Sequence, residues 1–158
     1  MTRLLFVLTL CCTPLGAAAQ TLTLASLFED ACLAPFDLFF GQTEDVLRGH
    51  GFEVQASGMT TEFTHEDTGM TGSYSANPEN PFCTIHDPRA TPEEASRTAQ
   101  TLLAASYDET PQPVPANDGQ TAWGISRGGC CYLTVQIDDR NPMDVREGAT
   151  MRLLVQDR

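Results

Sequence analysis

The sequence contains no lysine, and its nine basic side chains are all arginines. Against these it carries 21 aspartates and glutamates, so the formal net charge is −12. A surface of this sign repels phosphate backbones and anionic lipid headgroups. The composition therefore argues against nucleic acid as a partner and against a stable association with membranes.

Long apolar runs are also missing, apart from one at the start of the chain. Arg3 precedes an apolar run from Leu4 to Cys12, and small residues follow at 17–19. This layout predicts a signal peptide over residues 1–19, cleaved after Ala19. The run is too short for a membrane anchor, which needs about 20 apolar residues. We therefore expect an exported mature chain of residues 20–158, periplasmic or extracellular, that folds as a single domain with a net charge of −13.

The spacing of apolar residues in the mature chain predicts an α+β fold. A capping box of Ser26 and Glu29 predicts a helix that Pro35 interrupts, and Thr43 begins a second short helix. Thr91 and Pro92 begin a longer central helix. Short Thr-, Ser- and Phe-rich runs between glycines and prolines predict strands. We expect an antiparallel sheet of about five to seven short strands, one face covered by the N-terminal broken helix and the central helix.

The segment "DETPQPVPANDG" at residues 108–119 holds three prolines within five residues. This density predicts an exposed, stiff loop.

Two short motifs match enzyme signatures without their structural context. Residues 124–128 spell G-x-S-x-G, but a strand follows rather than a helix, and all three histidines come earlier in the chain. Residues 67–69 spell Asp-Thr-Gly once, where an aspartic protease needs two copies. Both are predicted to be turns, so the sequence offers no catalytic residue. It therefore favours a binding protein over an enzyme.

Four cysteines remain after the leader: Cys32, Cys83, Cys130 and Cys131. Strand alternation places Cys83 and Cys131 on the core side and Cys130 on the wetter side. In an oxidising compartment we favour a Cys32–Cys83 disulfide, which leaves Cys130 and Cys131 as a vicinal pair or as two thiols. A disulfide from Cys32 or Cys83 to Cys131 is the alternative pairing.

Cys83 and His86 form C-x-x-H, and Cys130 could add a third soft ligand for zinc. No second C-x-x-C or H-x-x-H accompanies them, so a metal site is the weaker interpretation. No cofactor is predicted.

The chain resembles small exported proteobacterial proteins of unknown function. The resemblance lies in a leader, Cys32 in the first helix, the strand Cys83-Thr84-Ile85, a covering helix and closing strands. It implies an α+β fold and no assigned activity.

These observations favour a non-catalytic exported module that binds an unknown protein or small ligand. Its candidate contact residues are Trp123, Cys130, Tyr132 and Thr134. For Trp123 the favoured interpretation is a half-buried aromatic residue of a strand. The alternative is a thiol-redox or metal-binding protein centred on Cys130 and Cys131, with Cys83 and His86. The sequence does not predict the oligomeric state.

Overall fold

A computed structural model describes residues 21–116, 120–128, 131–138 and 147–157. The expected signal peptide, residues 1–19, lies outside these ranges, as does Cys130. Within these ranges, no helix has the length and apolar character needed to cross a membrane.

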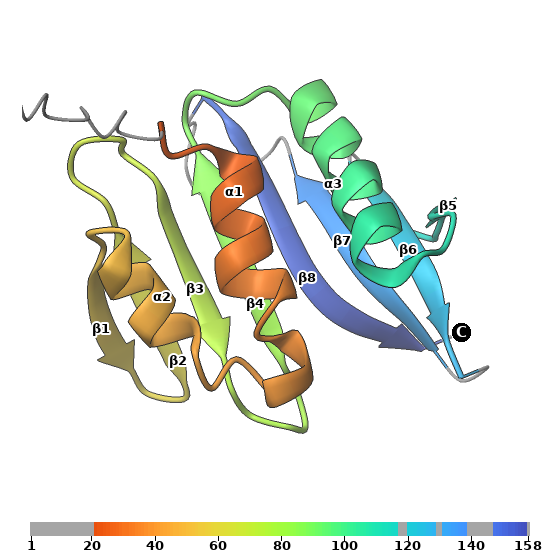
Figure 1. Cartoon of the computed structure of the whole chain (residues 1–158), viewed down its shortest axis with the longest axis horizontal. Helices are drawn as coiled ribbons and strands as arrows, with labels where there is room; N and C mark the ends of the chain where they lie inside the picture. The colour runs from red at the N-terminus through yellow and green to blue at the C-terminus, as the bar shows by residue number, and fades with distance from the viewer. Residues whose placement is uncertain (1–20, 117–119, 129–130, 139–146, 158) are drawn as a thin grey trace, which may run out of the picture.

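An eight-stranded antiparallel sheet lies at the centre of the molecule, in the order β1-β2-β3-β4-β8-β7-β6-β5 (Figure 1). The first four strands follow one another as hairpins. The last strand, β8, then pairs with both β4 and β7 and so joins the two halves of the sheet. The strands are β1 Glu53–Ser57, β2 Thr60–Thr64, β3 Thr71–Ser75, β4 Phe82–Asp87, β5 Gln112–Pro113, β6 Gln120–Arg127, β7 Cys131–Asp138 and β8 Ala149–Asp157.

The helices begin and end where local side chains satisfy or break the backbone hydrogen bonds. Thr91 caps α3, and Pro92 occupies its first turn, as the sequence predicts. The last hydrogen bond of the π-helical turn runs from the Ala34 N–H to the Glu29 carbonyl. Pro35 follows directly and ends the turn. The elements are α1 Leu24–Phe28, the π-helical turn η1 Glu29–Leu33, the 3-10 turn η2 Phe36–Leu38, α2 Thr43–Gly49 and α3 Pro92–Tyr107.

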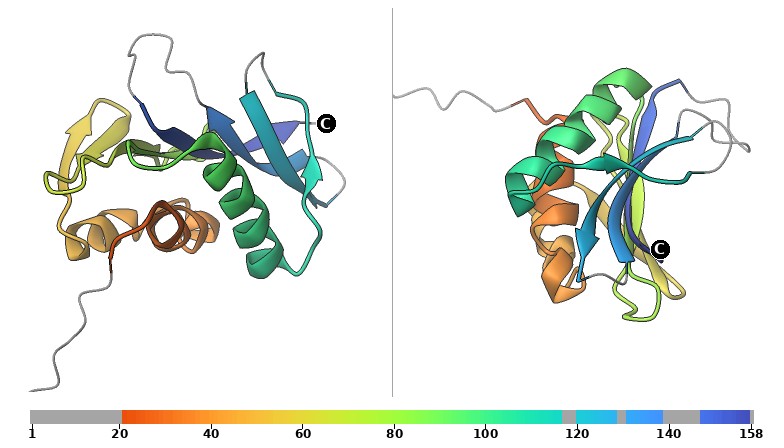
Figure 2. Two further views of the ribbon diagram at one scale, coloured as in Figure 1. Left: turned by 90° about the horizontal axis from the view of Figure 1, so that it is seen from above. Right: turned by 90° about the vertical axis from the view of Figure 1, so that its right-hand side faces the viewer.

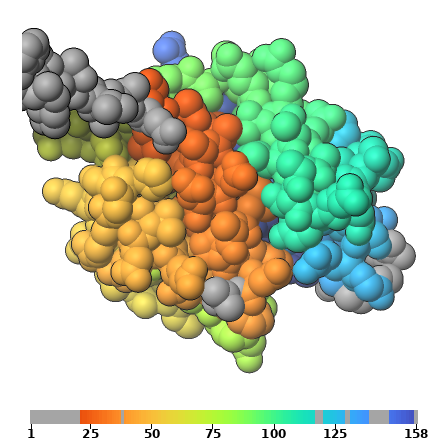
Figure 3. Space-filling view, viewed as in Figure 1, coloured from red at the N-terminus to blue at the C-terminus, as the bar shows by residue number. Residues whose placement is uncertain are grey.

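All of these helices cover one face of the sheet (Figure 2). In the space-filling view α1 and η1 lie between α2 and α3, so the three groups close over this face together (Figure 3). Alternate strand residues point into the layer between helices and sheet. Buried members of this core include Phe28, Cys32, Leu103, Cys83, Ile85, Leu133, Val135, Met151 and Leu153.

The α+β class and the antiparallel sheet are confirmed, but the expected five to seven strands are too few. The additional strand, β5, lies in the segment expected to be a loop. Gln112 and Pro113 pair there with Gly124 and Trp123 on β6.

The first helix also begins one turn earlier than expected. Thr23 is its N-cap, and Ser26 is the third helical residue of that capping box. Leu24 and Leu27 are both buried, so the earlier start turns an apolar side of the helix to the sheet.

The face of the sheet opposite the helices is here called the open face. Along β4, Cys83, Ile85 and Asp87 are buried toward the helices, while Phe82, Thr84 and His86 are only partly buried and point the other way. The same alternation continues across the paired strands, so the open face carries a separate and largely polar set of side chains.

Candidate functional site

The contact residues expected from the sequence do not lie on one surface. Trp123 is half-buried on the helix side, where its Nε1 donates to the Ser96 hydroxyl on α3 at 2.9 Å. Tyr132 and Thr134 belong to the open face instead. Thr134 is fully buried. It pairs with Gly124 on β6, and the side chain of Val114 lies next to Gly124. Trp123 therefore attaches α3 to the sheet, and Thr134 presents no surface to a partner.

The cysteines are divided between the core and the end of the sheet. A disulfide joins Cys32 to Cys83, the pairing favoured by the sequence, and both residues are fully buried. Cys131 is half-buried at the start of β7, where its Sγ lies 3.7 Å from the Arg127 carbonyl oxygen. Because Cys130 lies outside the described residues, the vicinal-pair and thiol interpretations stay predictions.

The weaker interpretation, a metal site of Cys83, His86 and Cys130, loses Cys83 as a ligand. Cys83 is bonded to Cys32 and points toward the helices, whereas His86 points to the open face. In the described part of the chain, no three side chains of the His, Cys, Asp and Glu types are grouped so as to hold a metal ion.

The enzyme-like motifs lie in ordinary local structure. Ser126 is part of β6, opposite Tyr132 in the hairpin that β6 makes with β7. A nucleophile elbow would instead place the serine at a sharp turn into a helix. The Asp-Thr-Gly motif, residues 67–69, lies in the turn between β2 and β3. The Gly69 N–H donates to the His65 carbonyl at 2.9 Å in this turn.

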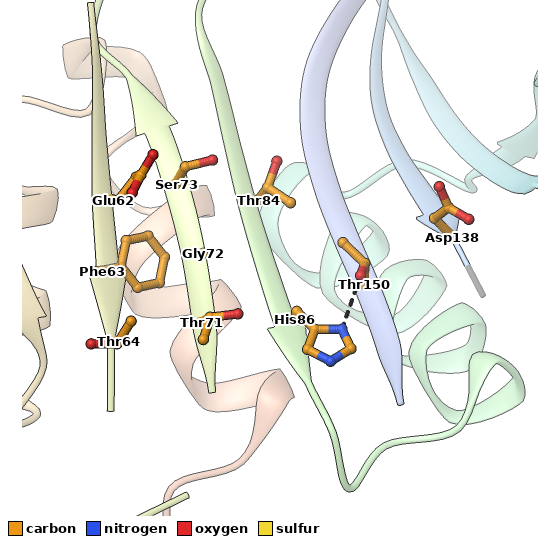
Figure 4. Close-up of a pocket in the computed structure, with 10 residues that line it drawn as sticks. All are labelled: Glu62, Phe63, Thr64, Thr71, Gly72, Ser73, Thr84, His86, Asp138 and Thr150. Atoms are coloured by element: carbon orange, nitrogen blue, oxygen red, sulfur yellow. Dashed lines mark hydrogen bonds between the residues drawn. The ribbon is translucent and has the colours of Figure 1, made fainter. Parts of the chain in front are cut away.

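A hollow of about 390 Å³ lies on the open face and is lined by residues of β2, β3, β4, β7 and β8 (Figure 4). Five hydroxyl side chains line it, together with His86 and the carboxylates of Glu62 and Asp138. The hydroxyls are those of Thr64, Thr71, Ser73, Thr84 and Thr150.

Strand register, rather than sequence proximity, brings these side chains together. Thr71 pairs with His86, His86 with Thr150, and Thr150 with Asp138, so one row crosses four strands. Figure 4 shows Thr71, His86 and Thr150 side by side in this row. A second row runs through Glu62, Ser73 and Thr84.

Hydrogen bonds within the first row hold its polar groups in place. His86 Nδ1 and the Thr150 hydroxyl lie 3.1 Å apart. At the far end, the Gln120 side-chain amide donates to the Asp138 carboxylate at 3.0 Å. Neighbouring strands therefore fix both the imidazole and the carboxylate, which lowers the entropy cost of binding a ligand.

The described residues that line the hollow include two carboxylates, those of Glu62 and Asp138. Glu62 is exposed on one side and Asp138 half-buried on the other. Arg152 follows Thr84 in the second row, but its guanidinium lies over the Phe82 ring, 4.9 Å from the centroid. No arginine is among the described residues that line the hollow.

Sequence reasoning missed this site, although part of its signal is visible in the chain. Thr84 and His86 alternate with buried residues on β4, and Glu62 and Thr64 do so around Phe63 on β2. This alternation shows that each strand has a polar side. Only the register shows that the polar sides form one lined hollow.

The arrangement can donate and accept many hydrogen bonds over a wide, preformed surface. The resemblance to exported proteobacterial proteins, which lies in the leader, Cys32, the strand Cys83-Thr84-Ile85, the covering helix and the closing strands, stays a prediction. No protein-family model, curated protein or solved structure matches the chain.

Proposed function

We propose that the chain is an exported, non-catalytic binding module that uses the hollow of the open face to hold a polar ligand. The observation that carries the proposal is the set of five hydroxyls around His86 on a face that no described helix covers. Hydroxyls both donate and accept hydrogen bonds, so they suit a ligand rich in amides or hydroxyls. Polar surfaces of this kind provide orientation and specificity in binding sites.

Export is part of the same proposal. The buried Cys32–Cys83 disulfide is of the kind that persists in an oxidising compartment. The expected leader over residues 1–19 would deliver the chain there.

The experiment is a nuclear magnetic resonance titration of the isotope-labelled mature chain, residues 20–158. Three probes are added separately: maltotriose, a neutral capped peptide Gln-Ser-Gly-Ser-Gly-Ser-Gln, and its counterpart with lysine at both ends. We expect at least one probe to shift the resonances of Thr71, Thr84 and His86 in a saturable way.

A matched pair of variants tests the location of binding. Thr84→Phe fills the hollow and is expected to abolish these shifts. Gln55→Phe places the same side chain on the same face at the exposed strand β1, outside the hollow, and is expected to leave them intact. Absence of shifts at the hollow with all three probes would overturn the proposed function.

A further inference from the structure

We infer that the open face carries a second binding site, which recognises the backbone of an extended peptide and is occupied by a strap of the chain itself. The strap is residues 113–116, at the β5 edge of the sheet. The site under it includes Gly124 on β6, Thr134 on β7 and Gln156 on β8. None of these three is among the described residues that line the hollow, so the inference goes beyond the proposed function.

The strap leaves the edge of the sheet and lies over the open face. Pro113 still pairs with Trp123 on β6, but two residues later the Pro115 carbonyl accepts from Gln156 Nε2 at 3.2 Å. Gln156 belongs to β8, which β6 and β7 separate from β5. Neighbouring strands are about 4.8 Å apart, so β5 and β8 are roughly 14 Å apart. Pro115 and Gln156 therefore meet above the two intervening strands.

Beneath the strap, the missing side chain of Gly124 makes room for Val114. A Cβ at Gly124 would lie 2.9 Å from Val114 Cγ1 and 3.4 Å from the Thr134 hydroxyl oxygen. Thr134 is fully buried, and its hydroxyl has no hydrogen-bond partner in the described part of the chain. Burying a polar group without a partner is unfavourable. The strap therefore covers a group that a better-matched ligand would bind.

Gln156 shows which chemical group the strap lacks. Its Nε2 donates to the Pro115 carbonyl, whereas its buried Oε1 has no partner among the described residues. In an extended residue the N–H and the C=O point to the same side, so one side-chain amide can bind both. Proline supplies the carbonyl without an N–H. The strap thus fills half of the site, and a peptide with an N–H at the position of Pro115 fills all of it.

Few interactions hold the strap in place. Pro113, Pro115 and Ala116 are exposed, and Val114 is half-buried. The Val114 N–H donates to the Ala122 carbonyl at 3.1 Å. Segments with little burial open readily, so a peptide from a partner competes with the strap, and its apparent affinity depends on the fraction of open molecules.

The test is a nuclear magnetic resonance titration of the mature chain with three capped hexapeptides. The first, Pro-Gln-Pro-Val-Ala-Ala, repeats residues 111–116 with alanine in place of Pro115. The second repeats the natural residues 111–116, and the third has N-methylalanine in place of Pro115. We expect the first probe to shift the resonances of Thr134 and Gln156. It should bind about fivefold more tightly than the other two, the effect of one hydrogen bond.

Three variants test the strap and the site. Val114→Gly removes the side chain over Gly124 and is expected to strengthen binding of the first probe, because the strap competes less. Gln156→Met removes the amide and is expected to make the first and third probes equal. Gln55→Met makes the same exchange on β1 and is expected to change neither.

A variant of the strap gives a readout without added peptide. Pro115→Ala supplies the missing N–H, and we expect this amide to exchange its hydrogen slowly and the first probe to bind more weakly than to the wild type. Addition of Gln156→Met to Pro115→Ala should abolish the slow exchange.

The outcomes separate this inference from the proposed function. Equal binding of the first and third probes, or fast exchange at position 115, would overturn recognition of the backbone N–H and leave the buried oxygens to water. Shifts confined to Thr84 and His86 would place the peptide in the hollow, which overturns the second site and supports the proposed function. Absence of shifts at the hollow does not alter the result expected at Thr134 and Gln156.

Discussion

Gly72, on β3 opposite Phe63 and Ile85, has no room for a side chain. A Cβ at this position would overlap the Thr84 carbonyl oxygen and the ring of Phe63. Phe63 is almost fully buried and packs edge-on against Phe52, so it has little room to move. We expect Gly72→Ala to lower the free energy of unfolding by about 1–3 kcal/mol, measured by urea denaturation.

Gly49 provides the matched control for this substitution. It lies at the end of α2, and a Cβ there would have no atom within 4 Å. Gly49→Ala is therefore expected to be neutral or slightly stabilising. Similar losses in both variants would mean that the contacts of Gly72 are not the cause.

Tyr107 reports the electrostatics at the end of α3. Burial raises the pKa of its hydroxyl above the ordinary value, the charge of Asp37 raises it further, and Arg127 lowers it. The Arg127 guanidinium lies 5.0 Å from the centre of the Tyr107 ring and 3.5 Å from the Asp37 carboxylate. We expect Asp37→Asn to lower the pKa of Tyr107 in a titration of isotope-labelled tyrosines.

Tyr74 is the internal reference for that titration. Its pKa is raised first by burial, and the nearby acids that raise it further are Glu44 and Asp45 rather than Asp37. Its titration should not move in Asp37→Asn. Both tyrosines have a folded-state pKa above the unfolded one, so their contribution to stability is complete below about pH 10 and is lost as the pH rises through the folded value.

At the scale of elements, both edges of the sheet lack some of the backbone hydrogen-bonding groups that a further strand would use. Just after β5, the Val114 N–H donates inward to the Ala122 carbonyl at 3.1 Å. Within β5, Pro113 therefore directs its nitrogen outward, and Pro111 and Pro115 flank the strand at the same two-residue spacing. Proline has no N–H, so this edge lacks outward donors at all three positions.

On the other edge, β1, a side chain caps one outward-facing carbonyl. Gly58 and Met59 form a two-residue turn, so Val54 and Ala56 direct their backbone groups away from β2. Arg48 Nη2 donates to the Val54 carbonyl at 3.3 Å. Glu44 holds the same guanidinium at 2.8 and 3.0 Å.

Removal of this cap should promote association between copies through β1. We expect Arg48→Ala to increase self-association at high concentration, measured by sedimentation velocity, because the Val54 carbonyl becomes available to a second strand. Arg97→Ala removes an equal charge from α3 and serves as the control. Equal self-association of the two variants would assign the effect to lost charge.

The same elements show how far the sequence can be interpreted alone. Strand alternation correctly placed Cys83 and Ile85 in the core, because a half-buried strand has a period of two. It did not predict β5, since prolines read as a loop unless the hydrogen-bonding partner strand is known. The hollow was missed for a related reason, because His86 and Asp138 meet only through the register of β4, β8 and β7.

At the scale of the whole molecule, the disulfide connects the two layers of the fold. Cys32 lies on η1 and Cys83 on β4, with a sequence separation of 51. Closing a loop of this size reduces the entropy of the unfolded chain and stabilises the fold by about 4 kcal/mol. We expect the double variant Cys32→Ala/Cys83→Ala to lose free energy of unfolding on this scale, measured by urea denaturation against the oxidised wild type.

Binding should respond differently from stability in this variant. Cys83 points toward the helices, whereas its neighbours Thr84 and His86 point into the hollow. The pairing of β4 with β3 and β8 does not involve the disulfide, so the rows of the hollow persist in folded molecules. Under conditions in which the variant is folded, its affinity for a probe that shifts the resonances of the hollow in the wild type should therefore match the wild type. A folded variant that no longer binds would show that the helical layer, and not the sheet alone, shapes the open face.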